Sequence, residues 1–304
     1  MNLGLVYPQT EFGSDLGLIR EFATAAEELG YRQLILYEHV LGADPGVHEL
    51  SGPYTWETEF HEPFVLFGYL SAITSAMELV TGILVLPQRQ TALVAKQAAT
   101  LQFVSGGRLV LGVGIGWNQV EYTALGQDFH RRGARMEEQI PLLRRLWSEP
   151  LLEFEGTFDR IPAAGIAPRP ARPIPIWMGG WANAVLDRTG RLADGWLTAA
   201  GSPRRWQDPN RIVTPKDLER RLRIVHDAAR KAGRDPSAIS VSMLVGMIGF
   251  DGLERFDADA WAARARSWGQ AGATHIALST LDLGFSPAQH MDAMVRFAQA
   301  WKRG

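Results

Sequence analysis

Short apolar runs alternate with helical patterns along the whole chain, and this alternation limits the folds that the chain can adopt. Each run is strand-sized and is followed by apolar residues at helical spacing, which predicts eight strand–helix units. The expected strands span 3–7, 34–37, 79–86, 109–113, 174–178, 195–197, 239–247 and 275–279. Strands separated by helices pair in parallel. Eight units favour a closed (β/α)₈ barrel that uses residues 1–304 as one domain, with a doubly wound open sheet as the second choice.

Three stretches are too long to be simple connections between a strand and a helix. They are residues 42–61, 150–173 and 201–214, and the second of them contains an expected hairpin around Glu155-Gly156. The first and third follow strands, and the loops that follow strands form the catalytic face of a barrel. The tryptophans and the tyrosine in these loops favour a substrate rim over tolerated surface insertions.

Composition excludes several classes of chemistry. The chain has no cysteine, which excludes disulfides, thiolate metal sites, iron–sulfur clusters and a thiol nucleophile. A net charge of −2 gives no basic excess for binding a phosphate backbone, so we expect no nucleic-acid partner. No apolar run approaches the ~20 residues of a membrane span, and the first residues lack the features of a signal peptide. We therefore expect a cytoplasmic protein that does not bind a membrane.

Glycines mark the carboxyl ends of two expected strands. Residues 111–118 read Leu-Gly-Val-Gly-Ile-Gly-Trp-Asn, which breaks the dinucleotide-binding fingerprint because Trp117 takes the place of its third glycine. The alternate glycines favour a backbone that passes close to a flat ligand, although relief of crowding inside a barrel explains them as well. Gly179 and Gly180 separate a strand from a helix, which is typical of an anion site at a helix start and also of a tight turn.

His39 is the candidate acid or base. Among the seven histidines, His39 and His275 fall within or at the end of an expected strand. His39 finishes its strand on the catalytic face of a barrel, whereas His275 begins its strand on the opposite face. Histidine exchanges protons near neutral pH, so we expect His39 to be the catalytic residue. The spacing of histidines and carboxylates fits no metal site, and no bound metal is expected.

Taken together, these residues resemble the luciferase-like superfamily of flavin- and deazaflavin-dependent oxidoreductases. The resemblance covers nearly the whole chain, in the order that the family shows, and is closest to the branch usually assigned to coenzyme F420. The matching segments are 4–8, 38–40, 81–90, 105–118, 128–135, 175–180 and 193–197. The resemblance implies an eight-stranded barrel with insertions after barrel strands.

The resemblance also implies a binding site for the ring of the cofactor. Glu38 and His39 correspond to the family's pair of an acidic residue and a histidine beside the reactive ring. The third strand is expected to carry a non-prolyl cis peptide at Ile83–Leu84 that bulges against the back of the ring. Gly114 and Gly116 are expected near the ring or its ribityl chain.

The same resemblance extends to the cofactor phosphate and to the substrate. The backbone N–H groups of Gly179, Gly180 and Trp181 are expected to face the phosphate. Tyr7, Trp117 and Trp181 are expected to line the pocket together with the loops 42–61 and 201–214, and this aromatic lining favours a hydrophobic or aromatic substrate. Trp117 stands where the family's sugar-phosphate dehydrogenases have a glutamate acid, which argues against a sugar phosphate.

Three functions remain open at this point. The first is an F420-dependent oxidoreductase that transfers a hydride between deazaflavin carbon C5 and a small organic substrate, with His39 moving the accompanying proton. The second is a two-component monooxygenase that uses reduced FMN and O₂, with a separate reductase supplying the reduced cofactor. The third is a non-catalytic cofactor-binding protein, against which the presence of His39 argues. The resemblance further suggests a homodimer through helices near 63–104, and Arg204 and Arg205 are candidates for holding a polyglutamyl tail.

Overall fold

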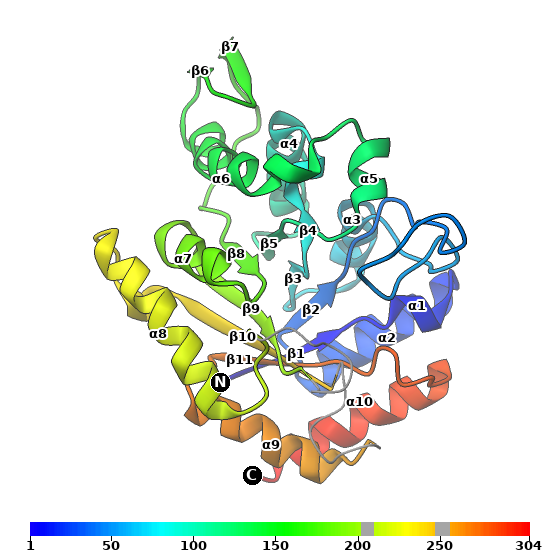
Figure 1. The fold of residues 1–304 in the computed structure, drawn as a ribbon. Helices are drawn as coiled ribbons and strands as arrows, with labels where there is room; N and C mark the ends of the chain where they lie inside the picture. Colours follow the sequence, from blue (N-terminus) through cyan, green and yellow to red (C-terminus); the bar gives the residue numbers. More distant parts are fainter. Residues whose placement is uncertain (202–209, 247–255) are drawn as a thin grey trace.

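The computed structural model describes residues 1–201, 210–246 and 256–304, and its centre is a barrel of parallel strands (Figure 1). The barrel strands are β1 (Asn2–Val6), β2 (Gln33–Leu36), β3 (Glu78–Thr81), β4 (Leu84–Val85), β5 (Leu109–Gly114), β8 (Ile176–Gly179), β9 (Gly195–Ala199), β10 (Ser240–Val245) and β11 (His275–Leu278). Their order within the described residues is β3-β2-β1-β11-β10-β9-β8-β5-β4, and an additional β3–β5 pairing closes the sheet. Because β3 and β4 are two pieces of one strand, the barrel has the eight positions that the sequence predicts.

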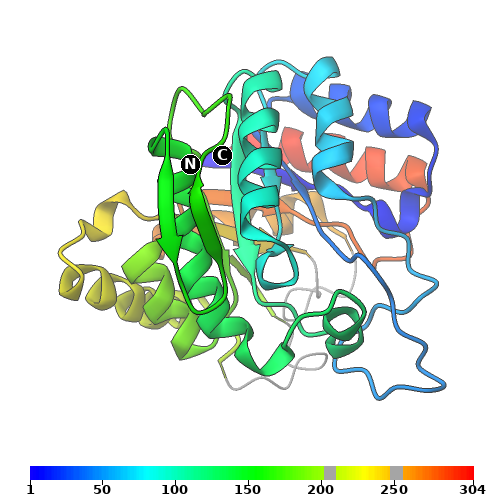
Figure 2. The same cartoon turned by 90° about the horizontal axis from the view of Figure 1, so that it is seen from above.

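Helices alternate with the strands and cover the outside of the barrel (Figures 1 and 2). They are α1 (Gln9–Phe12), α2 (Leu16–Leu29), α3 (Pro63–Ile73), α4 (Thr91–Val104), α5 (Gln119–Ala124), α6 (Arg132–Ser148), α7 (Asn183–Leu192), α8 (Pro215–Lys231), α9 (Ala258–Gln270) and α10 (Pro287–Lys302). Three 3₁₀ turns lie at Leu86–Gln88, Phe129–Arg131 and Pro236–Ala238. The (β/α)₈ barrel is confirmed, and the closing β3–β5 pair excludes the open sheet.

The period of two along each strand divides the buried apolar side chains into two groups. In β2, Leu34 and Leu36 point outward to the helices, whereas Ile35 points into the barrel. The inward group fills the barrel interior and consists of Val6, Ile35, Tyr37, Val80, Val110, Trp177, Leu197, Ala199, Leu244, Ala277 and Leu281. Several members of this group stand at the carboxyl ends of their strands, where they form the floor of the site described below.

Short polar motifs explain where two of the helices begin. Thr214 and Asp217 form a capping box at the start of α8, and Ser286 and Gln289 form another at the start of α10. In each box the hydroxyl accepts a backbone N–H while the partner side chain accepts the N–H of the capping residue. Each helix also has proline in its first turn, where the missing N–H costs nothing.

The three expected insertions differ in the structure. Residues 150–173 contain the expected hairpin, formed by β6 (Leu152–Glu155) and β7 (Arg160–Ala164), which projects beyond α6 (Figure 1). The turn of the hairpin is fixed because Glu138 of α6 accepts the N–H groups of residues 157–159. From residues 42–61, Pro53 and Tyr54 border the pocket at the carboxyl end of the barrel. Most of 201–214 lies outside the described residues, including Arg204 and Arg205.

Candidate active site

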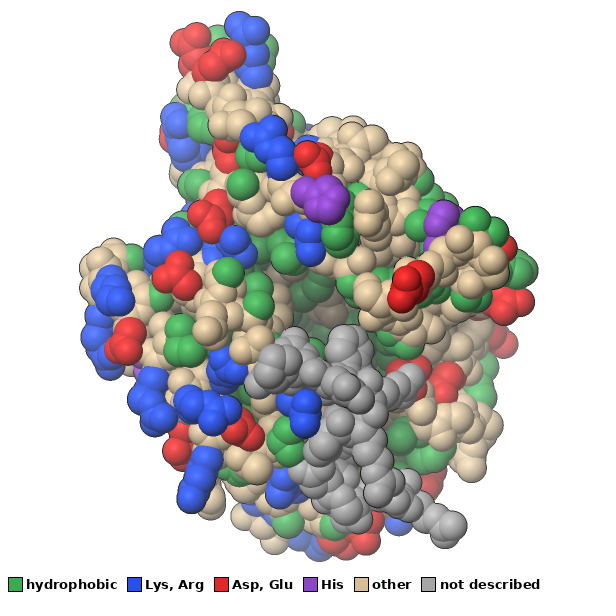
Figure 3. Space-filling model, viewed as in Figure 1, with side chains coloured by type: hydrophobic (Ala, Val, Ile, Leu, Met, Phe, Trp, Pro, Cys, Tyr) green, Lys and Arg blue, Asp and Glu red, His purple; other side chains and the backbone are tan. Residues whose placement is uncertain are grey.

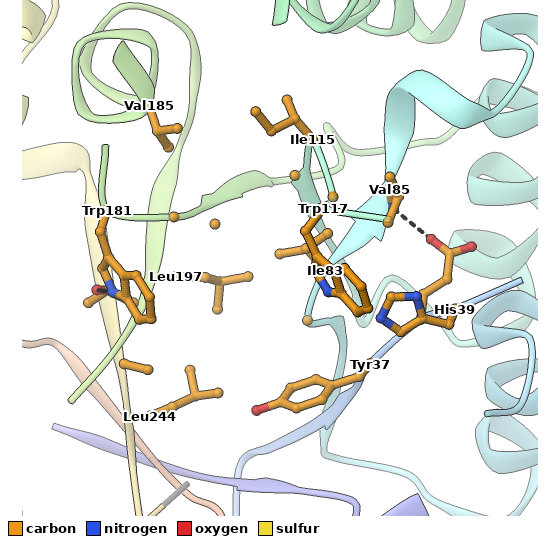
Figure 4. Close-up of a pocket in the computed structure, with 18 of the residues that line it drawn as sticks. Tyr37, His39, Ile83, Val85, Ile115, Trp117, Trp181, Val185, Leu197 and Leu244 are labelled. Carbon is orange, nitrogen blue, oxygen red and sulfur yellow. Dashed lines mark hydrogen bonds between the residues drawn. The ribbon is translucent and has the colours of Figure 1, made fainter. Parts of the chain in front are cut away.

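The carboxyl ends of the barrel strands surround an apolar pocket of about 400 Å³. Figure 3 shows a hollow at the centre of this face, with hydrophobic side chains at its border. Tyr37, Leu197 and Leu244 come from the inward group of barrel side chains and lie at its base, as Figure 4 shows. Trp181 stands on one side of the pocket and Trp117 on the other, next to His39.

Most of the residues that the sequence assigns to the cofactor come together in this pocket. They are Glu38, His39, Ile83, Gly114, Gly116, Trp117, Gly179, Gly180 and Trp181. Tyr7 and Leu84 do not line it, which corrects their expected placement. Tyr7 packs edge-to-face on Phe12 and Phe22, on the outer face of the barrel. Leu84 is fully buried and also belongs to the core that faces the helices.

The cis peptide lies one bond earlier than expected. It joins Gly82 to Ile83, and not Ile83 to Leu84. Gly82 is the residue that fits this crowded position, because a Cβ there would lie 2.3 Å from Cγ2 of Ile35. The interruption between β3 and β4 points Ile83 into the pocket, toward β5 and β8 (Figure 4).

The alternate glycines of β5 make room for neighbouring strands. A Cβ on Gly112 would lie 1.9 Å from the carbonyl oxygen of Thr81, and one on Gly114 would lie 2.7 Å from Cδ1 of Ile83. Gly179 meets the same isoleucine from β8, with 2.5 Å to Cγ2. Packing inside the barrel therefore explains the absence of side chains at these positions. The backbones of Gly114, Gly116 and Gly179 still line the pocket, so a ligand would lie against them and against Ile83.

A buried carboxylate contacts the imidazole of His39. Nδ1 of His39 lies 3.3 Å from Oε2 of Glu121, a buried residue of α5. Oε1 of Glu121 accepts the N–H groups of Val40 and Leu41, and Nε2 of Gln88 donates to Oε2 at 3.1 Å. Burial raises the pKa of Glu121. The hydrogen bond and the charge of His39, and the hydrogen bonds from Gln88 and Leu41, lower it by more, so this pKa lies below its ordinary value.

Three aromatic rings enclose the imidazole of His39. The rings of Tyr54, Phe60 and Trp117 lie with centroids 5.5, 5.0 and 5.3 Å from it, all in edge-to-face geometry. Tyr54 and Phe60 belong to the loop that follows β2. Gly52 of the same loop packs directly against Trp117. A Cβ at this position would come within 2.4 Å of the indole. The loop and the end of β5 thus shield one side of His39 from water.

Glu38 borders the pocket, but both of its oxygens are occupied. Oε2 accepts the N–H of Val85 at 2.6 Å, the bond that Figure 4 marks. Oε1 accepts Nε of Arg89 at 2.8 Å, and Arg89 also pairs with Glu62 at 2.9 Å. Burial raises the pKa of Glu38, against the effect of Arg89 and of the Val85 N–H. These contacts tie the end of β2 to β4, which makes Glu38 a support for the bulge rather than a group that faces a ligand.

The turn between β8 and α7 borders the opposite side of the pocket. Within the described residues, no side chain caps the start of α7, whose N-cap residue is Ala182. Trp196 Nε1 donates to the carbonyl oxygen of Gly180 at 2.9 Å, and Trp181 Nε1 donates to Thr198 Oγ1 at 3.0 Å, so the turn is fixed. The first N–H groups of a helix carry a partial positive charge and bind anions. The start of α7 thus borders this side of the pocket without a side-chain cap among the described residues.

Glu121 is the site residue that the sequence analysis missed. It lies three residues after Asn118, whose side chain caps α5, and it is buried although it is charged. A carboxylate on the buried face of a short helix that follows a strand end is a usable signal, because unpaired buried charges are rare. Its partner is 82 positions away in the chain, so local patterns could not reveal the contact.

Two structural features are absent from residues 1–201, 210–246 and 256–304. No group of three or more His, Asp or Glu side chains in them is arranged to hold a metal ion. No helix in these ranges is long and apolar enough to span a membrane.

Comparison with known proteins agrees with this fold and site. Residues 3–293 match the family model described as luciferase-like monooxygenase. An uncharacterised protein of Mycobacterium tuberculosis is 34% identical over 260 residues, which cover 83% of this chain and 85% of that protein. A solved structure described as an F420-dependent secondary alcohol dehydrogenase in complex with an F420–acetone adduct superposes with a TM-score of 0.77 at 18% identity, over 99% of this chain and 98% of that one.

The chain therefore belongs to the luciferase-like monooxygenase family, and it is an oxidoreductase. A further relative is the F420-dependent glucose-6-phosphate dehydrogenase of Intrasporangium calvum. That protein is 33% identical over 188 residues, which cover 59% of this chain and 52% of the dehydrogenase.

Proposed function

We propose that the protein is an F420-dependent oxidoreductase that transfers a hydride between deazaflavin carbon C5 and a small hydrophobic substrate. One observation carries the proposal: an apolar pocket lies between a helix start that no described side chain caps and a histidine that is hydrogen-bonded to a buried carboxylate. An F420-dependent dehydrogenase among the relatives supports the choice of cofactor. We further propose that residues 1–304 act as one catalytic domain.

The residues present fit a cofactor with an apolar ring and an anionic tail. Ile83 and the backbone of Gly114 and Gly179 offer a surface against which a flat ring can lie. The N–H group of Trp181 and the start of α7 would hold a phosphate, since a helix start stabilises negative charge. The N–H of Gly180, which the sequence analysis also assigned to the phosphate, donates instead to the carbonyl oxygen of Leu197 at 3.4 Å. We assign the ring to the side of the pocket that His39 borders.

A bound deazaflavin supplies a carbon that can accept or donate a hydride. His39 then holds or moves the accompanying proton at Nε2, the ring nitrogen that does not contact Glu121. The apolar walls exclude water from the reacting atoms, which protects the hydride and strengthens electrostatic interactions in the pocket. Trp117 and Trp181 orient the substrate between them.

The lining favours a hydrophobic substrate. The pocket is bordered mainly by aromatic and aliphatic side chains, among them Trp117, Val185 and Leu244. The relative from Intrasporangium calvum acts, by its name, on glucose 6-phosphate. We do not extend that substrate to this chain, because an indole at position 117 can neither accept nor release a proton in this role.

The second candidate is an FMN-dependent two-component monooxygenase that uses reduced FMN and O₂. The family description supports it, since it names luciferase-like monooxygenases. The same pocket would hold the flavin, and a separate reductase would deliver it in reduced form. His39 and its aromatic neighbours would keep water from the ring.

We also propose a homodimer. Val65 of α3 and Leu93, Phe103 and Val104 of α4 are large apolar side chains that are exposed on neighbouring helices. A second copy that covers them would remove this apolar area from water. Light scattering should then give twice the chain mass, and Phe103→Asp should give a monomer. A wild-type monomer would refute the proposal.

Binding spectra separate the two cofactors. The purified protein is titrated separately with F420 and with FMN, and fluorescence and the visible spectrum are recorded. We expect tight F420 binding and, without oxygen, bleaching of oxidised F420 when a substrate is added. Oxygen consumption with reduced FMN, without any binding of F420, would overturn the first candidate and establish the second. His39→Gln should bind the cofactor but lose turnover.

A further inference from the structure

We propose that Glu121 decides which ring nitrogen of His39 carries the proton, and that it is thereby the positioning residue for the proton chemistry of the site. The proposal rests on the proposed function only where it assigns a use to the free nitrogen. The tautomer itself is a property of the protein without cofactor.

The surroundings of Glu121 favour an ionised carboxylate. Its side chain is 1% exposed, and it is surrounded by donors from two segments, residues 39–41 and Gln88. Hydrogen bonds to a carboxylate favour its ionised form. An ionised carboxylate can only accept hydrogen bonds. Nδ1 of His39, 3.3 Å from Oε2, must therefore carry the proton, which leaves Nε2 of the neutral ring without one.

The carboxylate of Glu121 is held firmly beside His39. Oε1 accepts the two N–H groups that directly follow His39 in the chain, so the carboxylate also fixes the backbone that carries the imidazole. Asn118 completes the connection, because its Nδ2 donates to the carbonyl oxygen of Leu41 at 3.1 Å while its Oδ1 caps α5. The start of α5 and residues 39–41 are thus locked together.

The other described neighbours of His39 are aromatic rings and a carboxylate that has its own partners. Tyr54, Phe60 and Trp117 face the imidazole with ring edges or faces. Glu38, the adjacent carboxylate in the chain, is engaged by Val85 and Arg89. Within the described part of the chain, Glu121 is the charged group that forms an ion pair with His39.

These contacts predict how Glu121→Gln changes the hydrogen bonds around His39. The N–H groups of Val40 and Leu41 require an oxygen at the place of Oε1, so the amide NH₂ takes the place of Oε2. Nδ1 of His39 then faces a donor and must become an acceptor. The neutral ring changes to the tautomer with the proton on Nε2, and Gln88 must turn its amide to offer oxygen instead of nitrogen.

A matched control is Glu27→Gln at the other end of the barrel. Glu27 of α2 accepts the N–H groups of Ser75, Ala76 and Met77, and these bonds hold its pKa below its usual range although burial opposes them. It therefore reproduces the backbone contacts of Glu121 without a histidine. The two substitutions remove the same charge from a carboxylate that accepts backbone N–H groups, at a half-buried position for Glu27 and a buried one for Glu121.

The test is ¹⁵N NMR of the protein labelled at histidine, without cofactor, in alkaline buffer where imidazoles are neutral. The His39 signals are assigned by their absence in His39→Gln. We expect the Nδ1–H tautomer in the wild type and in Glu27→Gln, and the Nε2–H tautomer in Glu121→Gln. A wild-type ring that is mainly Nε2–H overturns the proposal even if Glu121→Gln does not fold. A folded Glu121→Gln that keeps Nδ1–H overturns it as well.

A second readout connects the tautomer to turnover. Loss of a comparable supporting partner lowers activity about 10–100-fold, and we expect this loss in kcat/KM for Glu121→Gln with a changed pH profile. Glu27→Gln should keep the wild-type pH profile. An unchanged pH profile in Glu121→Gln contradicts the positioning role. Failure of F420 binding would instead refute the proposed function, and the NMR result would stand.

Discussion

Two histidines stand at opposite ends of the barrel, and their surroundings differ in one decisive way. His39 follows β2, lines the pocket and contacts the carboxylate of Glu121. His275 begins β11, where its Nδ1 lies 2.8 Å from Thr274 Oγ1 and its Nε2 lies 3.1 Å from Nδ2 of Asn2. Both rings have an indole beside them in edge-to-face geometry. The histidine at the pocket has a charged partner, and the one at the far end has neutral partners.

The comparison shows that burial alone does not prepare a histidine for proton transfer. Burial, together with the charge of the N-terminus, lowers the pKa of His275 to about 4. This ring is therefore neutral near neutral pH. Two features distinguish His39. One of its ring nitrogens contacts a carboxylate, and its side chain lines the pocket.

The largest expected effect is the loss of activity on removing His39. His39→Gln should lower kcat about 10²–10⁴-fold, the usual contribution of a positioned acid or base. His275→Gln should leave kcat at neutral pH close to that of the wild type, because its ring is distant from the pocket in the barrel. Steady-state turnover with the cofactor selected by the binding spectra checks both variants. Equal losses in the two variants would break the comparison.

The next effect concerns stability below neutral pH. The pKa of His275 falls from 6.5 in the unfolded chain to about 4 in the folded protein, so the unfolded chain binds the extra proton between these values. Stability therefore falls as the pH falls through this window, by about 3 kcal/mol in total, and is unaffected above it. Urea unfolding at several pH values should show that His275→Gln flattens this dependence. A slope that persists in the variant would assign it to other groups.

Two glycines provide a smaller and paired test of the two ends. A Cβ on Gly114 would press on Ile83 in the pocket, and one on Gly195 would lie 2.5 Å from Trp177, the neighbour of His275. Each alanine substitution should destabilise the fold by about 1–3 kcal/mol through overpacking. Only Gly114→Ala should also weaken cofactor binding in a titration. If Gly195→Ala weakens binding equally, the two ends are coupled.

The smallest expected effect comes from a helix cap. Ser286 caps α10 with its hydroxyl, and Ser286→Ala should lower the free energy of unfolding by about 1 kcal/mol. The cap pairs with Gln289 and not with His39 or His275, so neither turnover nor the pH dependence of stability should change. Thermal unfolding checks the first expectation, and a change in turnover would show that α10 supports the pocket.

The sequence predicts the barrel well because its strands are patterned. The alternation in β1 already indicates the observed position of Tyr7. Leu3, Leu5 and Tyr7 share the face that packs on helices, while Val6 points inward. The position of His39 at a strand end was enough to place it in the pocket. Glu121 could not be placed in the same way, because its role depends on a contact between segments that are distant in the chain.

The shift of the cis peptide has a similar cause. The sequence pattern locates the third strand but not the residue at which it is interrupted, because that depends on how closely Gly82 approaches Ile35 of β2. The glycines of β5 were visible in the sequence, but their task depends on the side chain of Ile83 from another strand. Close approaches between strands are set by tertiary packing, which a single sequence does not display.

The contact between Gly52 and Trp117 has a consequence for protein engineering. The indole of Trp117 borders both the pocket and an outer groove of about 540 Å³ that residues 48–51 help to form, so it is a partition between two spaces. The lack of a side chain at position 52 is the counterpart of the large side chain at position 117. A designer who shortens residue 117 would merge the two spaces, and a larger residue at position 52 could restore the wall. Positions 52 and 117 should therefore be changed together when the pocket is redesigned for a substrate of another size.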